Sequence, residues 1–148
     1  MLADPTAVLI RPATWVDDGD ALAAIRRRVF IEEQQVPEAL EWDGEDLGAR
    51  HWLALHEGQP LGTVRLLADG HIGRMAVLMQ ARKNGLGSRL LRAAINAARA
   101  QGLVEVYLHA QMQALGFYGR HGFVAEGQLF MDAGIAHRAM RLVFLADS

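Results

Sequence analysis

The chain has 148 residues, of which 51% are hydrophobic and 22% charged, a composition that suits one globular domain, residues 1–148, with a sizeable core. Fifteen basic residues stand against seventeen acidic ones, and a formal net charge of −2 gives no overall positive field for nucleic acid or an anionic membrane. The absence of cysteine excludes disulfides, zinc–thiolate sites and cysteine-based acyl intermediates, and it is compatible with the reducing cytoplasm in which we expect the protein.

The N-terminal half is expected to combine short strands with one helix. Residues 8–11 indicate a strand, and Asp17 and Asp18 are N-cap candidates for the helix that follows. Four apolar positions of this helix should face the core: Leu22, Ile25, Val29 and Phe30. An acidic, turn-like segment comes after Pro37. Three apolar runs then follow, separated by the hairpin signals Glu57-Gly58 and Asp69-Gly70: residues 51–56, 61–68 and 71–78.

The C-terminal half is expected to begin with an amphipathic helix that Gly102 ends as its C′ residue. Six apolar residues at helical spacing form one stripe on it: Leu86, Leu90, Leu91, Ala94, Ile95 and Ala98. A strand over 104–109, a helix over 111–120 and two closing strands over 123–131 and 136–145 complete the chain. Strands that mostly form hairpins, interrupted by one β-α-β crossover, indicate an α/β protein of the α+β kind, with a mixed sheet covered by helices.

The most informative segment is a strand that leads through a basic turn into a helix, residues 71–88. Gly85 and Gly87 would let the backbone approach a ligand closely, and the free N–H groups of the first helical turn favour a phosphate. Arg82 and Lys83 add full positive charges. Because Leu90 stands at the third glycine position, the segment is not a dinucleotide fingerprint, and it lacks the Walker pattern. By itself, a Gly-x-Gly pair can equally be a tight turn.

Two blocks resemble the GNAT-type acyl-CoA N-acyltransferases. Arg82-x-x-Gly85-x-Gly87 is similar to the pyrophosphate signature of that family and follows a segment similar to its fourth strand. The second block is similar to the family's Asn-x-x-Ala-x-x-x-Tyr-x-x-x-Gly-Phe segment, with Gln111 in place of the usual Asn: Gln111, Ala114, Tyr118, Gly122 and Phe123. The resemblance covers essentially the whole chain.

Within the family, several pieces look most like the small bacterial ElaA-type acetyltransferases: Phe30-x-x-Glu33-Gln34, Glu41-x-Asp43-x-x-Asp46, His109-Ala-Gln111 and Gly134-Ile-x-His137-x-x-Met140. The acidic segment followed by Arg65 is also similar to acyl-homoserine-lactone synthases, although this chain is short for their acyl-carrier surface. The resemblance implies a mixed, mostly antiparallel sheet of six to seven strands flanked by about four helices, in which strands four and five splay apart.

This resemblance further implies acetyl-CoA, or coenzyme A, as the co-substrate, without a metal. Pantetheine would pair with the open strand-four backbone, and the Val77 N–H would face the thioester oxygen. The residues expected to hold the cofactor are Met75, Ala76, Val77, Arg82, Lys83, Asn84, Gly85, Leu86, Gly87, Ser88 and Gln111.

Catalysis needs an acid for the leaving thiolate and a base for the amine. Tyr118 aligns with the family's usual general acid, although a tyrosine on an apolar helix is also often a packing residue. His71 lies where histone acetyltransferase-type members carry a glutamate, and an imidazole suits proton removal near neutral pH. Glu33, His109 and His137 are alternative bases, and each histidine can instead be structural.

The acidic segment is a candidate site for a cationic amine, because Trp42 and Trp52 flank carboxylates that would attract an ammonium group. The residues expected to contact substrate are Glu33, Trp42, Asp43, His109 and His137. The alternative is a solvated loop in which Asp43 or Asp46 pairs with Arg65, a charged residue inside an apolar run.

Other enzyme classes lack support. Only Ser88 and Ser148 are serines, neither in a nucleophile elbow, and the six histidines show no metal-binding spacing. We therefore predict direct transfer of an acetyl group from acetyl-CoA to the primary amine of a small molecule. A non-catalytic acyl-CoA-binding module and a protein or peptide acetyltransferase, acting on lysines or N-termini, are the alternatives. Because edge strands of this fold often pair between subunits, a homodimer stays open.

Overall fold

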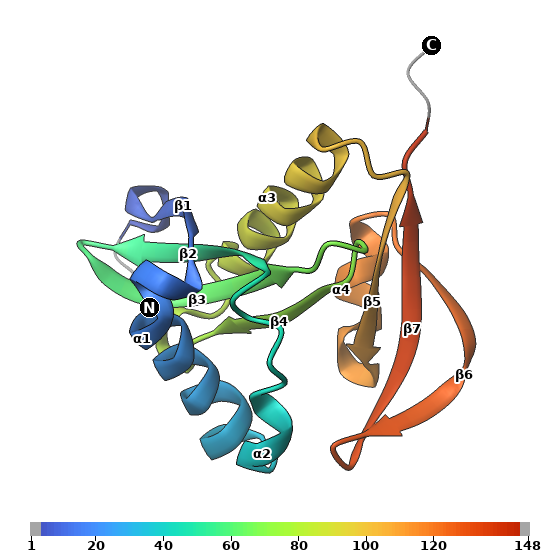
Figure 1. The fold of residues 1–148 in the computed structure, drawn as a ribbon, viewed down its shortest axis with the longest axis horizontal. Helices are drawn as coiled ribbons and strands as arrows, with labels where there is room; N and C mark the ends of the chain where they lie inside the picture. Colours follow the sequence, from blue (N-terminus) through green and yellow to red (C-terminus); the bar gives the residue numbers. More distant parts are fainter. Residues whose placement is uncertain (1–3, 146–148) are drawn as a thin grey trace.

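The computed structural model describes residues 4–145, which form two antiparallel sheets lying side by side with helices around them (Figure 1). The described chain has seven strands: β1 Leu9–Ala13, β2 Arg50–His56, β3 Gln59–Leu66, β4 Ile72–Val77, β5 Glu105–Gln111, β6 Val124–Asp132 and β7 Ile135–Val143. Its α-helices are α1 Trp15–Arg26, α2 Glu38–Glu41, α3 Leu86–Ala100 and α4 Leu115–Arg120, and α1 continues as a π-helix over Arg27–Glu33. This confirms the expected mixed, mostly antiparallel architecture.

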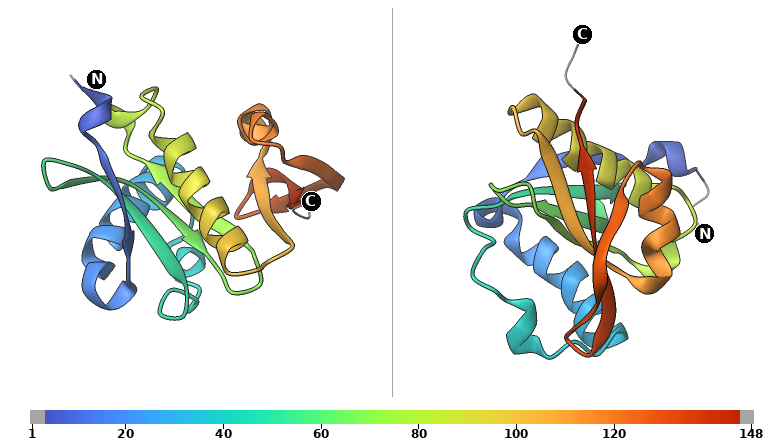
Figure 2. Two further views of the ribbon diagram at one scale, coloured as in Figure 1. Left: turned by 90° about the horizontal axis from the view of Figure 1, so that it is seen from above. Right: turned by 90° about the vertical axis from the view of Figure 1, so that its right-hand side faces the viewer.

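The first sheet, in the order β1-β2-β3-β4, is buried between α1 and α3 (Figure 2). Side chains alternate between the two faces of a strand, so neighbours in β2 enter different cores. Trp52 and Ala54 pack in the cluster that contains α3, whereas Leu53 packs in the cluster that contains α1. The continuous apolar sequence of β2 thus reflects a strand covered by a helix on each side.

Helix α3 has the expected amphipathic pattern, and all six residues of its apolar stripe are buried. It ends as expected at Gly102, whose positive φ of 92° is a conformation that glycine adopts without strain. Gly102 N–H donates to Arg99 O at 3.1 Å and Leu103 N–H donates to Ala98 O at 3.1 Å, the bond pattern of a Schellman motif.

Helix α1 begins earlier than the sequence pattern predicted. Thr14 is its N-cap, and the Thr14 side chain accepts a hydrogen bond from Asp17 N–H at 3.1 Å. Asp18 instead forms an ion pair with Arg11 at 2.9 Å. The prediction of Asp17 or Asp18 as the cap was wrong because a threonine three residues earlier already lies in the extended conformation that a cap requires.

The second sheet has the order β5-β7-β6 and meets the first at one place. A single parallel bridge joins His71 to Tyr107, where Tyr107 N–H donates to Gly70 O at 3.0 Å. From there β4 and β5 diverge, and the second sheet lies to one side of the open edge of β4 (Figure 1). The predicted splay of the fourth and fifth strands is confirmed. No helix within residues 4–145 is long and apolar enough to cross a membrane.

Candidate active site

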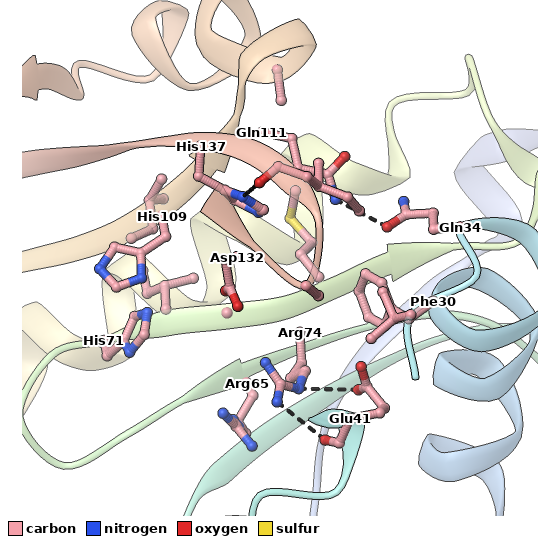
Figure 3. A pocket seen from close by; sticks show the side chains of 18 of the residues that line it. Phe30, Gln34, Glu41, Arg65, His71, Arg74, His109, Gln111, Asp132 and His137 are labelled. Carbon is pink, nitrogen blue, oxygen red and sulfur yellow. Dashed lines mark hydrogen bonds and ion pairs between the residues drawn. The ribbon is translucent and has the colours of Figure 1, made fainter. Parts of the chain in front are cut away.

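A cavity of about 340 Å³ lies where β4 and β5 diverge (Figure 3). Its walls come from β4, β5, α4, the turn between β6 and β7, and the segment from the end of the π-helix to α2. Six of the sequence-predicted site residues line it: His71, Met75, His109, Gln111, Tyr118 and His137. The divergence of two neighbouring strands therefore brings together residues from both halves of the chain.

The open edge of β4 presents backbone groups that β3 does not use. Leu78 N–H donates to Leu61 O at 2.9 Å, and antiparallel pairing alternates, so the N–H and C=O of Val77 point away from β3. The Val77 carbonyl accepts a hydrogen bond from Arg82 Nε at 2.9 Å, as this orientation requires. Ala76, by contrast, is buried in the core against α1.

The turn before α3 leaves the first amides of the helix without acceptors. The bond from Arg89 N–H to Gly85 O at 3.2 Å is the first of the helical ladder, and the N–H groups of Leu86, Gly87 and Ser88 have no acceptor within residues 4–145. Gly85 has a φ of +78°, and a Cβ there would meet open space. This N-terminus has the unpaired donors and positive dipole end that suit a phosphate.

The remaining side chains of the turn have different environments. Asn84 closes it, because Asn84 Nδ2 donates to Ala81 O and Arg82 O at 3.0 Å each. Lys83 is exposed. Arg82 is held by Glu33 through two hydrogen bonds of 2.7 and 2.8 Å, and the hydrogen bonds to this guanidinium lower the pKa of Glu33. Glu33, expected at the substrate, therefore lies in an ion pair outside the cavity lining.

Helix α4 brings Tyr118 next to the start of α3. A Cβ at Gly87 would lie 3.5 Å from the ring of Phe117, and Ser88 Oγ and His121 Nε2 are 3.0 Å apart. Phe117 packs edge-on against Tyr118, with ring centroids 5.1 Å apart. The Tyr118 hydroxyl has no hydrogen-bond partner in the described part of the chain, and burial raises its pKa to about 12. It is thus a neutral phenol at physiological pH.

Three histidines that line the cavity pack with two further rings in a cluster that we call the aromatic wall: His71, Tyr107, His109, Phe130 and His137. The imidazole of His71 stacks on Tyr107 with centroids 4.7 Å apart, and His109 lies 4.8 Å from it. Asp69 accepts hydrogen bonds from the Tyr107 hydroxyl and from His71 N–H. Burial, with a contribution from His109, lowers the pKa of His71 to about 4, so that this imidazole is neutral at pH 7.

The other two histidines of the wall differ in exposure. His109 is exposed and contacts Phe130 edge-on, with ring centroids 5.1 Å apart. His137 is buried, with its Nδ1 2.7 Å from Ile135 O. Because a backbone carbonyl can only accept, His137 Nδ1 carries a proton.

Across the cavity lies a charge network of three arginines and three carboxylates: Arg26, Glu41, Asp43, Asp46, Arg65 and Arg74. Arg26, only 1% exposed, donates to Glu41 at 2.9 Å and to Asp46 at 2.6 Å. Arg65 donates to both carboxylate oxygens of Asp43, at 2.9 and 2.8 Å. The expectation that a buried Arg65 pairs with Asp43 or Asp46 is therefore confirmed for both residues.

Burial and ion pairing act in opposite directions on the acids of this network. Burial would raise the pKa of Asp43, but the hydrogen bonds and charge of Arg65 outweigh it and hold that pKa far below its usual range. At Glu41 burial is the stronger effect, and the pKa is raised. Trp42, expected at the substrate, lies between the guanidinium groups of Arg26 and Arg27, 5.2 and 5.6 Å from its ring, and does not line the cavity.

Among the cavity residues that were not predicted as site residues, three polar ones stand out: Gln34, Arg74 and Asp132. Gln34 accepts a hydrogen bond from Gln111 Nε2 at 2.9 Å, linking the end of the π-helix to β5 across the cavity. Arg74 lies within a strand whose neighbours are apolar, a pattern that could have marked it as an inward-facing charge. Asp132 lies beside the β6–β7 turn, and no local pattern distinguishes it from a solvated turn residue. Within residues 4–145 no group of three or more metal-ligating side chains comes together.

Two splayed antiparallel sheets with an open strand edge, and a helix N-terminus beside a buried tyrosine, define an acyltransferase of the GNAT class. The family described as acetyltransferase (GNAT) domain matches residues 14–144, and the chain belongs to this family. The Bacillus subtilis protein YyaT is 41% identical over 136 residues, which cover 88% of this chain and 91% of YyaT.

Solved structures show the same relationship. An acyl-CoA N-acyltransferase from Pseudomonas aeruginosa has a TM-score of 0.83 and 35% identity, with 92% of this chain and 99% of that chain covered. Escherichia coli ElaA also has a TM-score of 0.83, with 26% identity over 90% of this chain and 99% of ElaA. The resemblance to ElaA-type proteins inferred from the sequence is thereby confirmed.

Proposed function

We propose that this protein transfers an acetyl group from acetyl-CoA to the primary amine of a small molecule, directly and within a ternary complex. The observation that carries the proposal is that one cavity, beside the open edge of β4, is lined by both a neutral phenol, Tyr118, and a neutral imidazole, His71. The family assignment and the name of the Pseudomonas relative, an acyl-CoA N-acyltransferase, support it.

The residues present fit coenzyme A. The free amides of Leu86, Gly87 and Ser88 and the exposed Lys83 would hold its pyrophosphate, and the open space at Gly85 leaves room for it. The backbone from Met75 to Val77 would pair with the pantetheine arm, which Gln111 would contact from β5. Arg82 would add its positive charge to the pyrophosphate site while it stays paired with Glu33. When bound, the coenzyme supplies a thioester carbonyl that an amine can attack.

In this mechanism each protein group handles one proton or one charge. A bond forms between the amine nitrogen and the acetyl carbon, and the bond from that carbon to sulfur breaks. His71 removes the proton that the amine loses, because its low pKa keeps it unprotonated at neutral pH. Val77, the expected oxyanion donor, lies six residues from His71 along an extended strand, roughly 20 Å at about 3.3 Å per residue, and does not line the cavity. In this proposal a backbone N–H of the cavity-lining part of β4 stabilises the oxyanion, and Tyr118 donates its proton to the departing thiolate.

Two features favour a small acceptor over a protein. The cavity is about 340 Å³, and the Gln34–Gln111 hydrogen bond links two of its walls. Asp43 and Trp42 each contact an arginine and do not line the cavity, so in this proposal they hold the arginines in place and do not touch the acceptor. His109 and His137 would contact the acceptor from the aromatic wall. We also propose a cytoplasmic location, since a chain without cysteine needs no oxidising compartment.

The test is an assay of the purified protein with acetyl-CoA, a panel of small primary amines and a thiol reagent that reports free coenzyme A. We expect thiol release that depends on the amine, together with coenzyme A binding by calorimetry. Binding of coenzyme A without thiol release for any amine would favour a non-catalytic binding module. Acetylation of peptide lysines or N-termini, with no small amine accepted, would favour the protein-modifying alternative.

A further inference from the structure

Arg74 occupies a strained position in the strand that borders the cavity. The register of β3 against β4 shifts between Thr63 and Arg65, so that Arg74 and Met75 together oppose one residue of β3 in a β-bulge. Arg74 has a φ of +49°, an uncommon value for a residue with a side chain. Bulges redirect side chains next to active sites, and such strain is retained where a side chain must be held in one place. Both residues of this bulge line the cavity.

Arg74 is also the arginine of the charge network that keeps a terminal nitrogen available. Arg26 uses Nε, Nη1 and Nη2 for hydrogen bonds, and Arg65 uses both of its terminal nitrogens. Arg74 Nη2 donates to Glu41 O and Asp43, each at 3.1 Å, whereas Arg74 Nη1 has no partner within residues 4–145. The side chain of Arg74 is 25% exposed and lies along the cavity.

A second donor in the same place is unpaired. Arg65 is 3% exposed and lines the cavity, and its Nε is buried without a hydrogen-bond partner. Buried donors are nearly always satisfied, but this Nε is covered by protein and out of reach of a ligand in the cavity, so Arg74 Nη1 is the donor that a ligand could use. The neighbouring carboxylates do not provide a partner for the free nitrogen of Arg74, since Glu41 and Asp43 already bind two arginines each.

Asp132 provides the opposite charge on the far side of the cavity. It forms no ion pair with any residue in the range 4–145 and, in Figure 3, lies between the imidazole groups of the aromatic wall and Arg74. A ligand that reaches from Arg74 to Asp132 would thus meet an anion-binding group at one end and a cation-binding group at the other, in a cavity that the proposed base, His71, also lines.

We infer that the acceptor is an amino acid, whose carboxylate binds Arg74 Nη1 and whose amine lies next to Asp132 and His71. This inference rests on the proposed acetyl-CoA-dependent function and names its substrate class. The test compares free α-amino acids with their C-terminal amides in the thiol-release assay, and measures the binding of both by calorimetry. We expect kcat/KM about tenfold or more higher for the amino acids, the factor that one charged hydrogen bond carries.

The variant Arg74→Gln should remove this preference by lowering kcat/KM for amino acids about tenfold while leaving the amides within about twofold. Arg74→Lys retains the charge and should recover part of the preference, and thermal unfolding checks that both variants are folded. Arg27→Gln, in an exposed ion pair outside the cavity, is the matched control and should leave both substrates unaffected.

Different outcomes separate the two proposals. Turnover of amides or diamines in preference to amino acids, or an equal loss for both substrates in Arg74→Gln, would overturn the inference and leave the acetyltransferase function standing. Arg74-dependent binding of amino acids without any acetyl transfer would support the inference and contradict the proposed function.

Discussion

The charge network and the aromatic wall face each other across one cavity, and they hold their polar groups in opposite ways. In the network, guanidinium and carboxylate groups are ion-paired, as Arg26 is with Glu41 and Asp46. In the wall, His71 contacts rings and has no ion pair in the described chain. The arginines lower the pKa of Asp43 and Asp46 despite burial, so these carboxylates stay charged. Burial lowers the pKa of His71, so this imidazole is neutral.

This difference teaches how burial can serve two purposes in one site. Buried charges persist only where partners compensate their loss of hydration, and the resulting ion pairs hold the network side of the cavity in place. A buried group without such a partner favours its neutral form instead, which leaves His71 an unprotonated imidazole and Tyr118 a protonated phenol at neutral pH. We therefore expect substitutions in the network other than at Arg74 to act mainly on stability, and substitutions at the wall and Tyr118 to act mainly on turnover.

Breaking the network should have the largest effect. Arg26→Ala would leave Glu41 and Asp46 buried with fewer compensating charges, and we expect the free energy of unfolding to fall by about 3–5 kcal/mol in denaturant titrations. Arg27→Ala removes an exposed ion pair with Glu38 and is the control, for which we expect an unchanged midpoint. Equal midpoints for the two variants would show that the network adds nothing to stability.

Tyr118→Phe tests the acid. We expect kcat to fall by about 100- to 1000-fold, because the thiolate would leave without a proton donor, while the Kd for coenzyme A stays nearly constant. Tyr107→Phe is the matched control, since its hydroxyl is engaged by Asp69, and it should lose much less. If Tyr118→Phe retained full turnover, Tyr118 would be a packing residue.

His71→Gln tests the base within the aromatic wall. We expect kcat/KM to fall about 100-fold, as general-base catalysis contributes at least this much. His109→Gln, the neighbouring exposed imidazole, should reduce kcat/KM by only about threefold. The reverse order of effects would transfer the role of base to His109.

The acid sensitivity of the fold gives the smallest predicted effect. The pKa of His71 is lowered from 6.5 to about 4, so between these pH values the unfolded chain binds a proton that the folded chain does not. Stability is therefore lost as the pH falls from 6.5 to 4, with a contribution from His71 of about 1–2 kcal/mol. His71→Phe should be less sensitive to acid than the parent protein in urea titrations at pH 7.5 and 4.5. Parallel losses of stability in both would contradict the assignment.

Local patterns were sufficient to predict the elements around the site. The apolar stripe of α3 and the glycine at its end follow from helical periodicity and from a backbone conformation that glycine favours. The spacing of the two family blocks also predicted that the segment of Tyr118 lies near the start of α3, and its helix neighbours Phe117 and His121 contact Gly87 and Ser88 there. The start of α1 was misplaced because both Thr14 and the aspartates after it can cap a helix.

Apart from the pairing of Arg65 with Asp43 and Asp46, the ionic partners could not be predicted in the same way. Arg82 was expected to point at a phosphate and Glu33 at an amine, yet they bind one another across 49 residues of sequence. Asp132 carried no signal, and Gln34 stood out only as part of a family-like segment, although both line the cavity. Pairing of charges depends on which elements meet, and residue spacing contains no information about that.

The amino-acid sequence by itself determined the strands, the principal helix and the family, because periodicity, capping and motif spacing act between residues close in the chain. The tertiary structure alone decided which charges are neutralised and which groups face the cavity. Packing of the first sheet against α1 and α2 closed the arginine–carboxylate network, and the divergence of β4 from β5 left Tyr118 and His71 beside an open strand edge.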